Sequence, residues 1–178
     1  ILDGEHILYD KRGNFINLFA CFDIYFSNNK NLMIYPFINF DGIIYDSENI
    51  EKDIFRWSEM NKYIADLNSE CVISTYKDKL KIKSKTFYSN AEGDIFKECK
   101  KILDGVDDET MFEYETDGLI FTPSDKSVGS EFVGEKLEPS KRTWPYSLKW
   151  KPSEFNTIDF LVTTKKNDNG EDFIGNIF

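Results

Sequence analysis

The pattern of apolar and polar positions along the chain predicts strands first and helices later. Residues 1–9 and the aromatic-rich run 15–26 each predict a strand, and the polar residues 10–14 between them predict a turn. Residues 32–45 are apolar but are broken by Pro36 and by an Asp-Gly pair, which favours irregular or edge structure. The chain is therefore expected to open with a hairpin.

Two later segments carry helical spacing. Residues 48–67 place apolar side chains three and four positions apart, which predicts an amphipathic helix. A second helix is predicted over residues 92–103, with Gly105 as its C-cap. The inward face of the first helix is expected to consist of Ile50, Ile54, Trp57, Met60, Ile64 and Leu67.

Several shorter strands are predicted around these helices. They cover residues 71–76, 77–85, 111–121, 146–151 and about 157–164, and Asn169-Gly170 is typical of a hairpin turn. Hairpin signals mixed with two helices predict an α+β fold, with antiparallel or mixed sheets and flanking helices, rather than a regularly wound α/β fold. With 178 residues, the chain (1–178) has the length of one domain.

Composition and charge narrow the classes of partner. The chain is 40% hydrophobic and 16% aromatic, which indicates a well-filled interior. Its net charge is -10, so any RNA must be held at a local site rather than along a basic surface. No apolar run approaches the roughly 18 residues of a membrane span, so no membrane partner is expected. An odd, unclustered set of 3 cysteines favours a reducing compartment.

The first candidate for chemistry is a pair of lysines. Lys149 and Lys151 are two residues apart on a predicted strand, so both ammonium groups project from one face. Two like charges aimed at one place repel unless an anion lies between them, and a nucleotide triphosphate meets that need. The alternative is two solvent-facing lysines beside a core tryptophan.

Carboxylates next to glycines form the second candidate. Asp3 or Glu5, and Asp117, lie in apolar segments where a carboxylate is costly to bury unless it is paired or bound to a cation. Opposite a lysine pair they would hold a divalent metal on phosphates, or hydrogen-bond a ribose. The alternative is that Asp-Gly is simply a turn dipeptide, as at Asp41-Gly42.

Two further features have open interpretations. Phe22 offers a face on which a base can stack, but in so aromatic a segment it can equally be core filler. Lys77 to Lys85 alternate with other residues, which places five lysines on one strand face. That face is either a basic track for an RNA 5′ end or a solvated edge strand whose lysines block edge-to-edge pairing.

Taken in order, four segments resemble the covalent nucleotidyltransferases, the superfamily of ATP-dependent DNA ligases, RNA ligases and GTP-dependent mRNA capping enzymes. The segments are Leu2 to Glu5, Phe19 to Asp23, Thr116 to Pro123 and Leu148 to Pro152. The resemblance implies a nucleotidyltransferase domain that uses a divalent metal, Mg or Mn. It implies that Glu5 lies near the ribose and metal, Phe22 stacks on the purine, Asp117 binds the metal, and Lys149 and Lys151 bind phosphate.

The run D-G-L-I-F-T-P, together with L-K-W-K-P and N-T-I-D-F, is more similar to capping guanylyltransferases than to ligases. The composition is most similar to the multifunctional capping enzymes of large DNA viruses. This implies an mRNA guanylyltransferase that moves GMP from GTP, through a lysyl-GMP intermediate, to the diphosphate 5′ end of nascent mRNA. It also implies a cytoplasmic location, in a viral factory or virion, and RNA triphosphatase, OB-fold and methyltransferase domains on the same polypeptide. The alternatives are the adenylation domain of an ATP-dependent polynucleotide ligase and a non-catalytic scaffold in a capping assembly.

One departure from the family pattern bears on activity. The signature K-x-D-G, whose lysine becomes covalently guanylylated, does not occur in the sequence. The family places that signature ahead of D-G-E, which implies that the nucleophile lies before Ile1. The 178-residue chain alone is therefore expected to be partial, without the OB-fold, and to form no covalent adduct.

Overall fold

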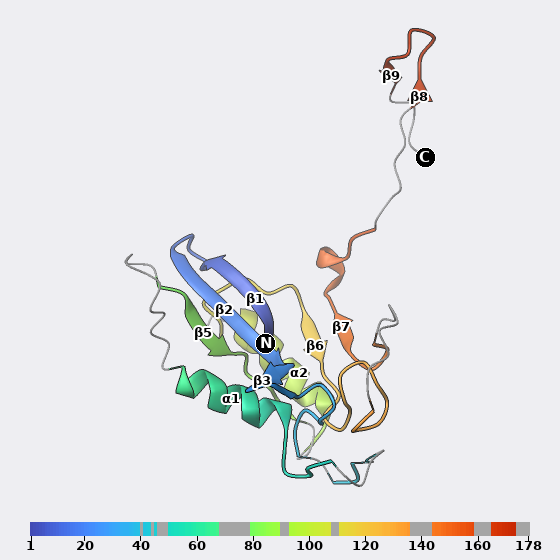
Figure 1. The fold of residues 1–178 in the computed structure, drawn as a ribbon. Coiled ribbons are helices and arrows are strands. Elements are labelled where there is room, and N and C mark those ends of the chain that lie inside the picture. Colours follow the sequence, from blue (N-terminus) through green and yellow to red (C-terminus); the bar gives the residue numbers. More distant parts are fainter. Residues whose placement is uncertain are drawn as a thin grey trace.

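The structure is a computed structural model that describes residues 1–39, 41–43, 45, 50–67, 79–89, 93–107, 111–135, 144–158 and 165–173. Over these residues the fold is mixed α+β, with small sheets and two α-helices (Figure 1). The predicted α+β class is confirmed at this level. No described helix has the length and apolar character needed to cross a membrane.

The central sheet has the order β1-β2-β5. β1 (Leu2–Tyr9) pairs antiparallel with β2 (Phe15–Ile24), and β5 (Lys81–Ser84) adds to β2 in parallel as an edge strand. The opening hairpin and its polar turn are thus confirmed. The basic strand is shorter than the expected 77–85, and the strand expected at 71–76 lies outside the described residues.

β2 separates two groups of buried side chains because alternate residues point to opposite faces. Cys21 belongs to a core that includes Leu32, Tyr35, Met60 and Val133. Leu18 and Ala20 pack on the other face with Tyr114. This division leaves one face of the sheet to α1 and the other to the cavity described below.

α1 (Arg56–Asp66) begins well after the start of the predicted helix at 48–67. The backbone N–H groups of Arg56 and Trp57 donate to the carbonyl oxygens of Pro36 and Phe37, at 3.0 and 2.9 Å. These bonds satisfy donors that have no partner inside a helix, which fixes the helix start there. Met60 is fully buried, whereas Trp57 is 40% exposed and faces the cavity rather than the core.

The side chain of Arg56 is the most deeply buried charge in the described structure, at 0% exposure. Its Nε donates to Asp23 Oδ1 at 2.9 Å, and its Nη1 donates to the carbonyl oxygens of Lys126, at 3.0 Å, and Tyr35. The guanidinium also lies 5.4 Å from the Phe37 ring centroid. Burial raises the pKa of Asp23 and the charge of Arg56 opposes that shift. One residue thereby joins β2, α1 and two loops.

α2 (Ile95–Asp107) lies on the side of the sheet opposite to α1 (Figure 1). The helix expected at 92–103 is present but displaced, because Asp94 caps its start by accepting the N–H of Phe96 at 2.9 Å. The C-cap assigned to Gly105 is wrong, since the helix continues through that residue. A Cβ at Gly105 would lie 2.8 Å from the side chain of Met111, so the glycine makes room for packing instead.

A second sheet is formed by β6 (Leu119–Phe121) and β7 (Leu148–Trp150), which pair antiparallel. Only the last part of the strand expected at 111–121 forms. Residues 111–118 run along the central sheet and supply Tyr114 to its buried face. The strand at 146–151 is confirmed in its central residues.

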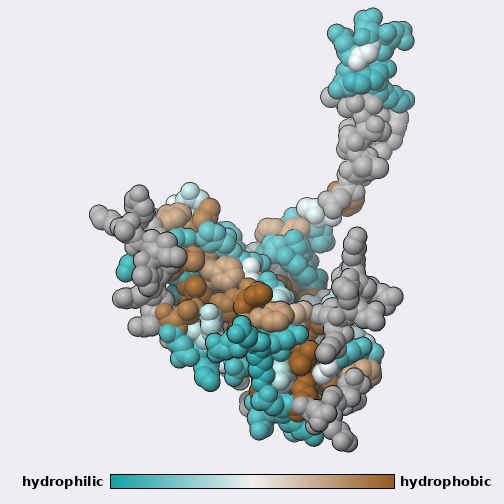
Figure 2. Space-filling view, viewed as in Figure 1, coloured by the Kyte–Doolittle hydropathy of each residue, from teal (hydrophilic) through white to brown (hydrophobic). Residues whose placement is uncertain are grey.

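Short elements complete the description. β3 (Phe26–Ser27) pairs with β4 (Lys30–Asn31), β8 (Lys165–Lys166) pairs with β9 (Asp172–Phe173), and a 3-10 turn spans Ser153–Phe155. The β8–β9 hairpin turns at Asn169-Gly170, as expected. Of the strand expected at 157–164, residues 159–164 lie outside the described part and 157–158 form no strand. In Figure 2 hydrophobic side chains gather near the centre of the visible face, while the β8–β9 hairpin is almost wholly hydrophilic.

Candidate functional site

A cavity of about 690 Å³ lies between the central sheet, α2 and β6. Three of the residues singled out in the sequence line it: Glu5 from β1, Phe22 from β2, and Asp117 just before β6. Its walls are largely apolar and include Phe37, Phe55, Trp57, Ile95, Ile102, Leu103 and Phe112. A large apolar pocket with a few convergent charged groups is the usual form of a small-molecule site.

Phe22 reaches the cavity through an irregularity in the sheet. The pairing of β1 with β2 shifts between Asp3, which lies opposite Asp23, and Gly4, which lies opposite Cys21. Phe22 therefore has no partner on β1, and such bulges change the direction of a side chain. Phe22 is half-buried and lines the cavity, and it belongs to neither buried core cluster. This placement does not match simple core filler.

Glu5 lines the cavity and forms an ion pair with a lysine. Glu5 Oε2 lies 2.5 Å from Nζ of Lys85, and that ammonium lies 5.7 Å from the centroid of the Phe22 ring. The Lys85 side chain is 21% exposed. Its backbone N–H donates to the Cys21 carbonyl at 2.7 Å, which holds the residue immediately beyond the end of β5. A ring, a carboxylate and an ammonium thus meet at one wall.

Asp3, the alternative carboxylate, points elsewhere. Its Oδ2 accepts the hydroxyl of Tyr25, and it is not among the residues that line the cavity. Burial and the Asp3 carboxylate both raise the pKa of Tyr25, so its hydroxyl stays a donor at neutral pH. Of the two carboxylates that the sequence left open, the structure brings Glu5 to the cavity.

At the rim of the cavity, Asp117 forms ion pairs with Lys149 of β7 and with Lys151, which directly follows β7. Lys149 Nζ lies 3.2 Å and Lys151 Nζ lies 2.6 Å from the same Oδ2 atom. The hydrogen bond from Lys151 lowers the pKa of Asp117, burial opposes that shift, and Lys149 adds to the lowering. The three side chains are between 32% and 47% exposed, so the cluster is open to solvent. The two ammonium groups converge on one anion, as their spacing predicts.

Neither Asp-Gly segment of the site is a turn. A Cβ on Gly4 would lie 2.7 Å from the carbonyl oxygen of Ala20, within the β1–β2 pairing. A Cβ on Gly118 would lie 2.0 Å from the carbonyl oxygen of Trp150. Each glycine allows two backbone segments to approach closely. The residue next to each one lines the cavity: Glu5 beside Gly4, and Asp117 beside Gly118.

The carboxylates suit one manner of holding a divalent cation. The described residues contain no group of three or more His, Cys, Asp or Glu side chains placed to ligate a metal. Mg²⁺ is commonly held by one or two carboxylates together with the phosphates of a ligand and several waters. Glu5 and Asp117 line the same cavity and each is paired with a lysine ammonium group, and their role as metal ligands stays a prediction.

Lys85 lines the cavity although sequence reasoning gave it no separate role, and the same holds for Glu98, Glu115 and Glu154. Lys85 was grouped with a five-lysine face, of which Lys77 lies outside the described residues and Lys79 precedes the strand. The available signal was its position at the end of the alternating run. Cys99 of α2 also lines the cavity and was not anticipated there.

Comparison of the chain with protein-family models, with curated proteins and with solved structures finds no match. The nucleotidyltransferase fold, the catalytic activity and the viral origin therefore stay predictions.

Proposed function

We propose that this chain carries the nucleotide-binding part of an mRNA guanylyltransferase, and that the cavity of about 690 Å³ holds GTP. One observation carries the proposal. Asp117, at the rim of the cavity, gathers Lys149 and Lys151, while Glu5 and Phe22 line the same cavity. Segments up to about 150 residues apart in sequence thus bring an aromatic ring, two carboxylates and two lysines to the cavity and its rim.

The purine end of the ligand is assigned to the wall formed by Phe22 and Lys85. A ring stacks on any base, so Phe22 contributes affinity and little selectivity. The ammonium of Lys85 is a donor without acceptor capacity, and guanine presents the O6 and N7 acceptors where adenine presents N7 and an amino donor. This donor favours GTP over ATP. It supports a guanylyltransferase over the ligase alternative.

The triphosphate is assigned to the lysine cluster. Phosphate oxygens would replace Asp117 as the partner of Lys149 and Lys151, because a triphosphate offers more negative charge and the present pairs are solvent-exposed. The displaced Asp117, together with Glu5, would hold a divalent cation, which when bound neutralises charge on the phosphates. The two lysines orient the α-phosphate and stabilise the pyrophosphate that leaves.

In this proposal the reaction also needs a lysine amine that the K-x-D-G signature supplies in the family. That amine forms a bond to the α-phosphorus of GTP as pyrophosphate departs, and the guanylate then passes to a terminal phosphate oxygen of the RNA. The residues of this chain bind and orient the nucleotide for both transfers. They supply charge stabilisation rather than the nucleophile.

Titration with a fluorescent GTP analogue in the presence of Mg²⁺ tests the proposal on the 178-residue chain itself. We expect saturable binding that GTP competes more strongly than ATP does. Lys149→Ala or Lys151→Ala should each weaken binding by about tenfold to a hundredfold, the loss expected for a positioned charged donor.

Lys166→Ala is the matched control. Lys166 also pairs with an aspartate across a two-stranded sheet, Asp172, but it does not line the cavity. Its removal should leave binding unchanged. Preference for ATP would favour the ligase alternative, and no nucleotide binding at all would favour the scaffold. Equal losses at Lys149, Lys151 and Lys166 would mean that charge acts diffusely and would contradict the clamp.

A further inference from the structure

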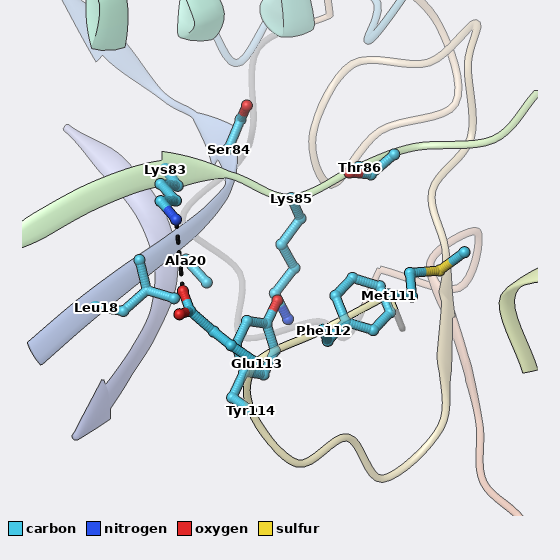
Figure 3. Close-up of a pocket in the computed structure, with 10 residues that line it drawn as sticks. All are labelled: Leu18, Ala20, Lys83, Ser84, Lys85, Thr86, Met111, Phe112, Glu113 and Tyr114. Atoms are coloured by element: carbon cyan, nitrogen blue, oxygen red, sulfur yellow. Dashed lines mark hydrogen bonds and ion pairs between the residues drawn. The ribbon is translucent and has the colours of Figure 1, made fainter. Parts of the chain in front are cut away.

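A second, smaller cavity of about 430 Å³ lies beside the first, between β5 and residues 111–114. Figure 3 shows Lys83 and Lys85 on β5 and its continuation, with the Lys85 side chain extending toward Phe112 and Tyr114. Leu18 and Ala20 of β2 close the cavity from the sheet. The two cavities share Lys85, Thr86, Phe112 and Tyr114 in their linings, so they are neighbours.

The segment around β5 is locally basic although the whole chain is acidic. Residues 79–89 contain the lysines at 79, 81, 83 and 85 and no carboxylate. Lys81 and Lys83 lie two residues apart on β5, on one face of the edge strand, and both are exposed. Lys83 lines the small cavity, so an anion that follows the strand would reach that cavity.

The ion pair of Lys83 is weak enough for a phosphate group to replace its carboxylate partner. Its Nζ lies 3.4 Å from Oε1 of Glu113, and the two side chains are 63% and 44% exposed. Exposed ion pairs of this kind contribute little to stability, because water screens them. A phosphate group with more charge would therefore displace Glu113 from the lysine.

Aromatic rings complete the arrangement. Phe112 is half-buried and lines both cavities. The buried ring of Tyr114 packs against it, with ring centroids 5.6 Å apart and planes tilted by 35°. Proteins that bind single-stranded nucleic acid combine a basic path for the backbone with rings that contact the bases. An acidic peptide would use the lysines but would gain nothing specific from the Phe112 ring.

We infer that β5 and the small cavity form the entry site for the phosphorylated 5′ end of a single-stranded RNA. Lys81 and Lys83 contact its phosphates, and the 5′-terminal phosphates enter the small cavity beside Lys83, next to the nucleotide cavity. Of the two interpretations of the basic face left open by the sequence, this selects the RNA track. It rests on the proposed function for the identity of the RNA end, but Lys81 and Lys83 are separate from the lysine clamp formed by Lys149 and Lys151.

The test is binding of a short, 3′-labelled RNA that carries a 5′-diphosphate, measured by fluorescence anisotropy over a series of salt concentrations. We expect Lys81→Gln and Lys83→Gln each to weaken binding by about threefold to tenfold. Each should also reduce the slope of log affinity against log salt by about 0.7, the value for one phosphate contact on a single strand. Lys100→Gln removes the same charge from α2, outside both cavities, and should change neither quantity.

Competitors decide what the site takes. A 5′-hydroxyl RNA should bind several-fold more weakly than the 5′-diphosphate RNA. Equal binding of the two would overturn the terminal-phosphate assignment, and equal competition by inorganic pyrophosphate alone would reduce the site to a phosphate site. Competition by polyglutamate as strong as by RNA would show a site for acidic peptides instead.

The outcome is separable from that of the proposed function. Lys83→Gln should leave binding of the fluorescent GTP analogue within about twofold of wild type, because Lys83 lines only the small cavity. If the wild type does not bind GTP, but Lys81→Gln and Lys83→Gln still weaken RNA binding, the guanylyltransferase proposal alone is refuted. Intact GTP binding with equal RNA binding by wild type, Lys81→Gln and Lys83→Gln would refute this inference alone.

Discussion

Gly118 and Trp150 approach so closely that a Cβ atom on the glycine would lie 2.0 Å from the tryptophan carbonyl oxygen. Gly118 also has a φ of +145°, a conformation that residues with side chains rarely adopt. The contact sits at the start of the β6–β7 pairing, where Leu119 lies opposite Trp150. It is this approach that brings Asp117 within reach of the lysines on either side of Trp150.

Gly118→Ala should therefore separate β6 from β7 and weaken binding of the GTP analogue by about tenfold or more. The reason is that the added methyl group meets backbone, which cannot move aside as a flexible side chain can. Gly170→Ala is the matched control, because Gly170 has a φ of +79° but nothing within 4 Å of its Cβ position. If both variants lose binding equally, the close approach is not what holds the cluster together.

Phe22→Ala should weaken GTP binding by roughly tenfold to a hundredfold, since base stacking contributes about 1–3 kcal/mol per base. Its melting temperature should stay close to that of the wild type, because the ring lines a cavity. A buried filler residue would instead lose about 3–5 kcal/mol of stability on truncation to alanine. A large fall in melting temperature with unchanged GTP affinity would contradict the stacking role.

The sequence predicted the opening hairpin, and the central part of the basic strand β5, because their patterns are local. Period-two alternation and the Asp10 turn are decided by neighbours in the chain, and Asp10 Oδ1 indeed accepts the N–H groups of Arg12 and Asn14 at 2.9 and 2.7 Å. The pairing of Asp117 with Lys149 and Lys151 was anticipated only as a convergence on an anion. That the anion is a side chain of this chain depends on the β6–β7 register, which no local pattern encodes.

Long-range contacts explain the errors at the helices. The start of α1 is set by carbonyl groups of residues 36 and 37, far ahead in the sequence, so the apolar spacing over 48–67 extended the predicted helix too far. Glycine is the usual residue at a helix C-cap, but Gly105 lies within α2 and leaves space for the side chain of Met111. The position of Lys85 in the cavity could not be predicted for a similar reason, because its ion-pair partner Glu5 is 80 residues away in the sequence.

The buried pair of Arg56 and Asp23 predicts a large effect on stability. Arg56→Ala should lower the free energy of unfolding by about 3–5 kcal/mol, because it leaves a buried carboxylate without its partner. Lys30→Ala, which breaks the exposed pair of Lys30 with Glu51, should cost no more than about 1 kcal/mol. Urea denaturation measures both. Replacing both partners, with Arg56→Met and Asp23→Leu, should restore much of the loss, and failure to do so would assign the effect to packing or to the lost backbone bonds.

Cys21 predicts a dependence of stability on alkaline pH. Burial raises the pKa of its thiol from 9.0 to about 11, so the unfolded chain loses this proton first as the pH rises. The contribution is fully present below about pH 9 and is lost as the pH approaches 11, by about 2–3 kcal/mol in total. Thermal unfolding of the wild type and of Cys21→Ala across this range measures it. The melting temperature of the variant should fall less steeply, and parallel curves would contradict the assignment.

The two described cysteines should also differ in their reaction with a thiol reagent, and the difference reports on the cavity. Cys99 is half-buried on α2 and lines the large cavity, whereas Cys21 is fully buried in the core and holds its proton. At pH 8, iodoacetamide should therefore label Cys99 much faster than Cys21, and peptide mapping by mass spectrometry assigns the label to each residue. Saturating GTP should slow the labelling of Cys99 several-fold, because the nucleotide fills the space through which the reagent arrives. The same GTP should leave Cys99 unprotected in Lys151→Ala, which binds the nucleotide weakly. Labelling of Cys99 that is indifferent to GTP, at a concentration where the fluorescent analogue is displaced, would place the nucleotide outside this cavity.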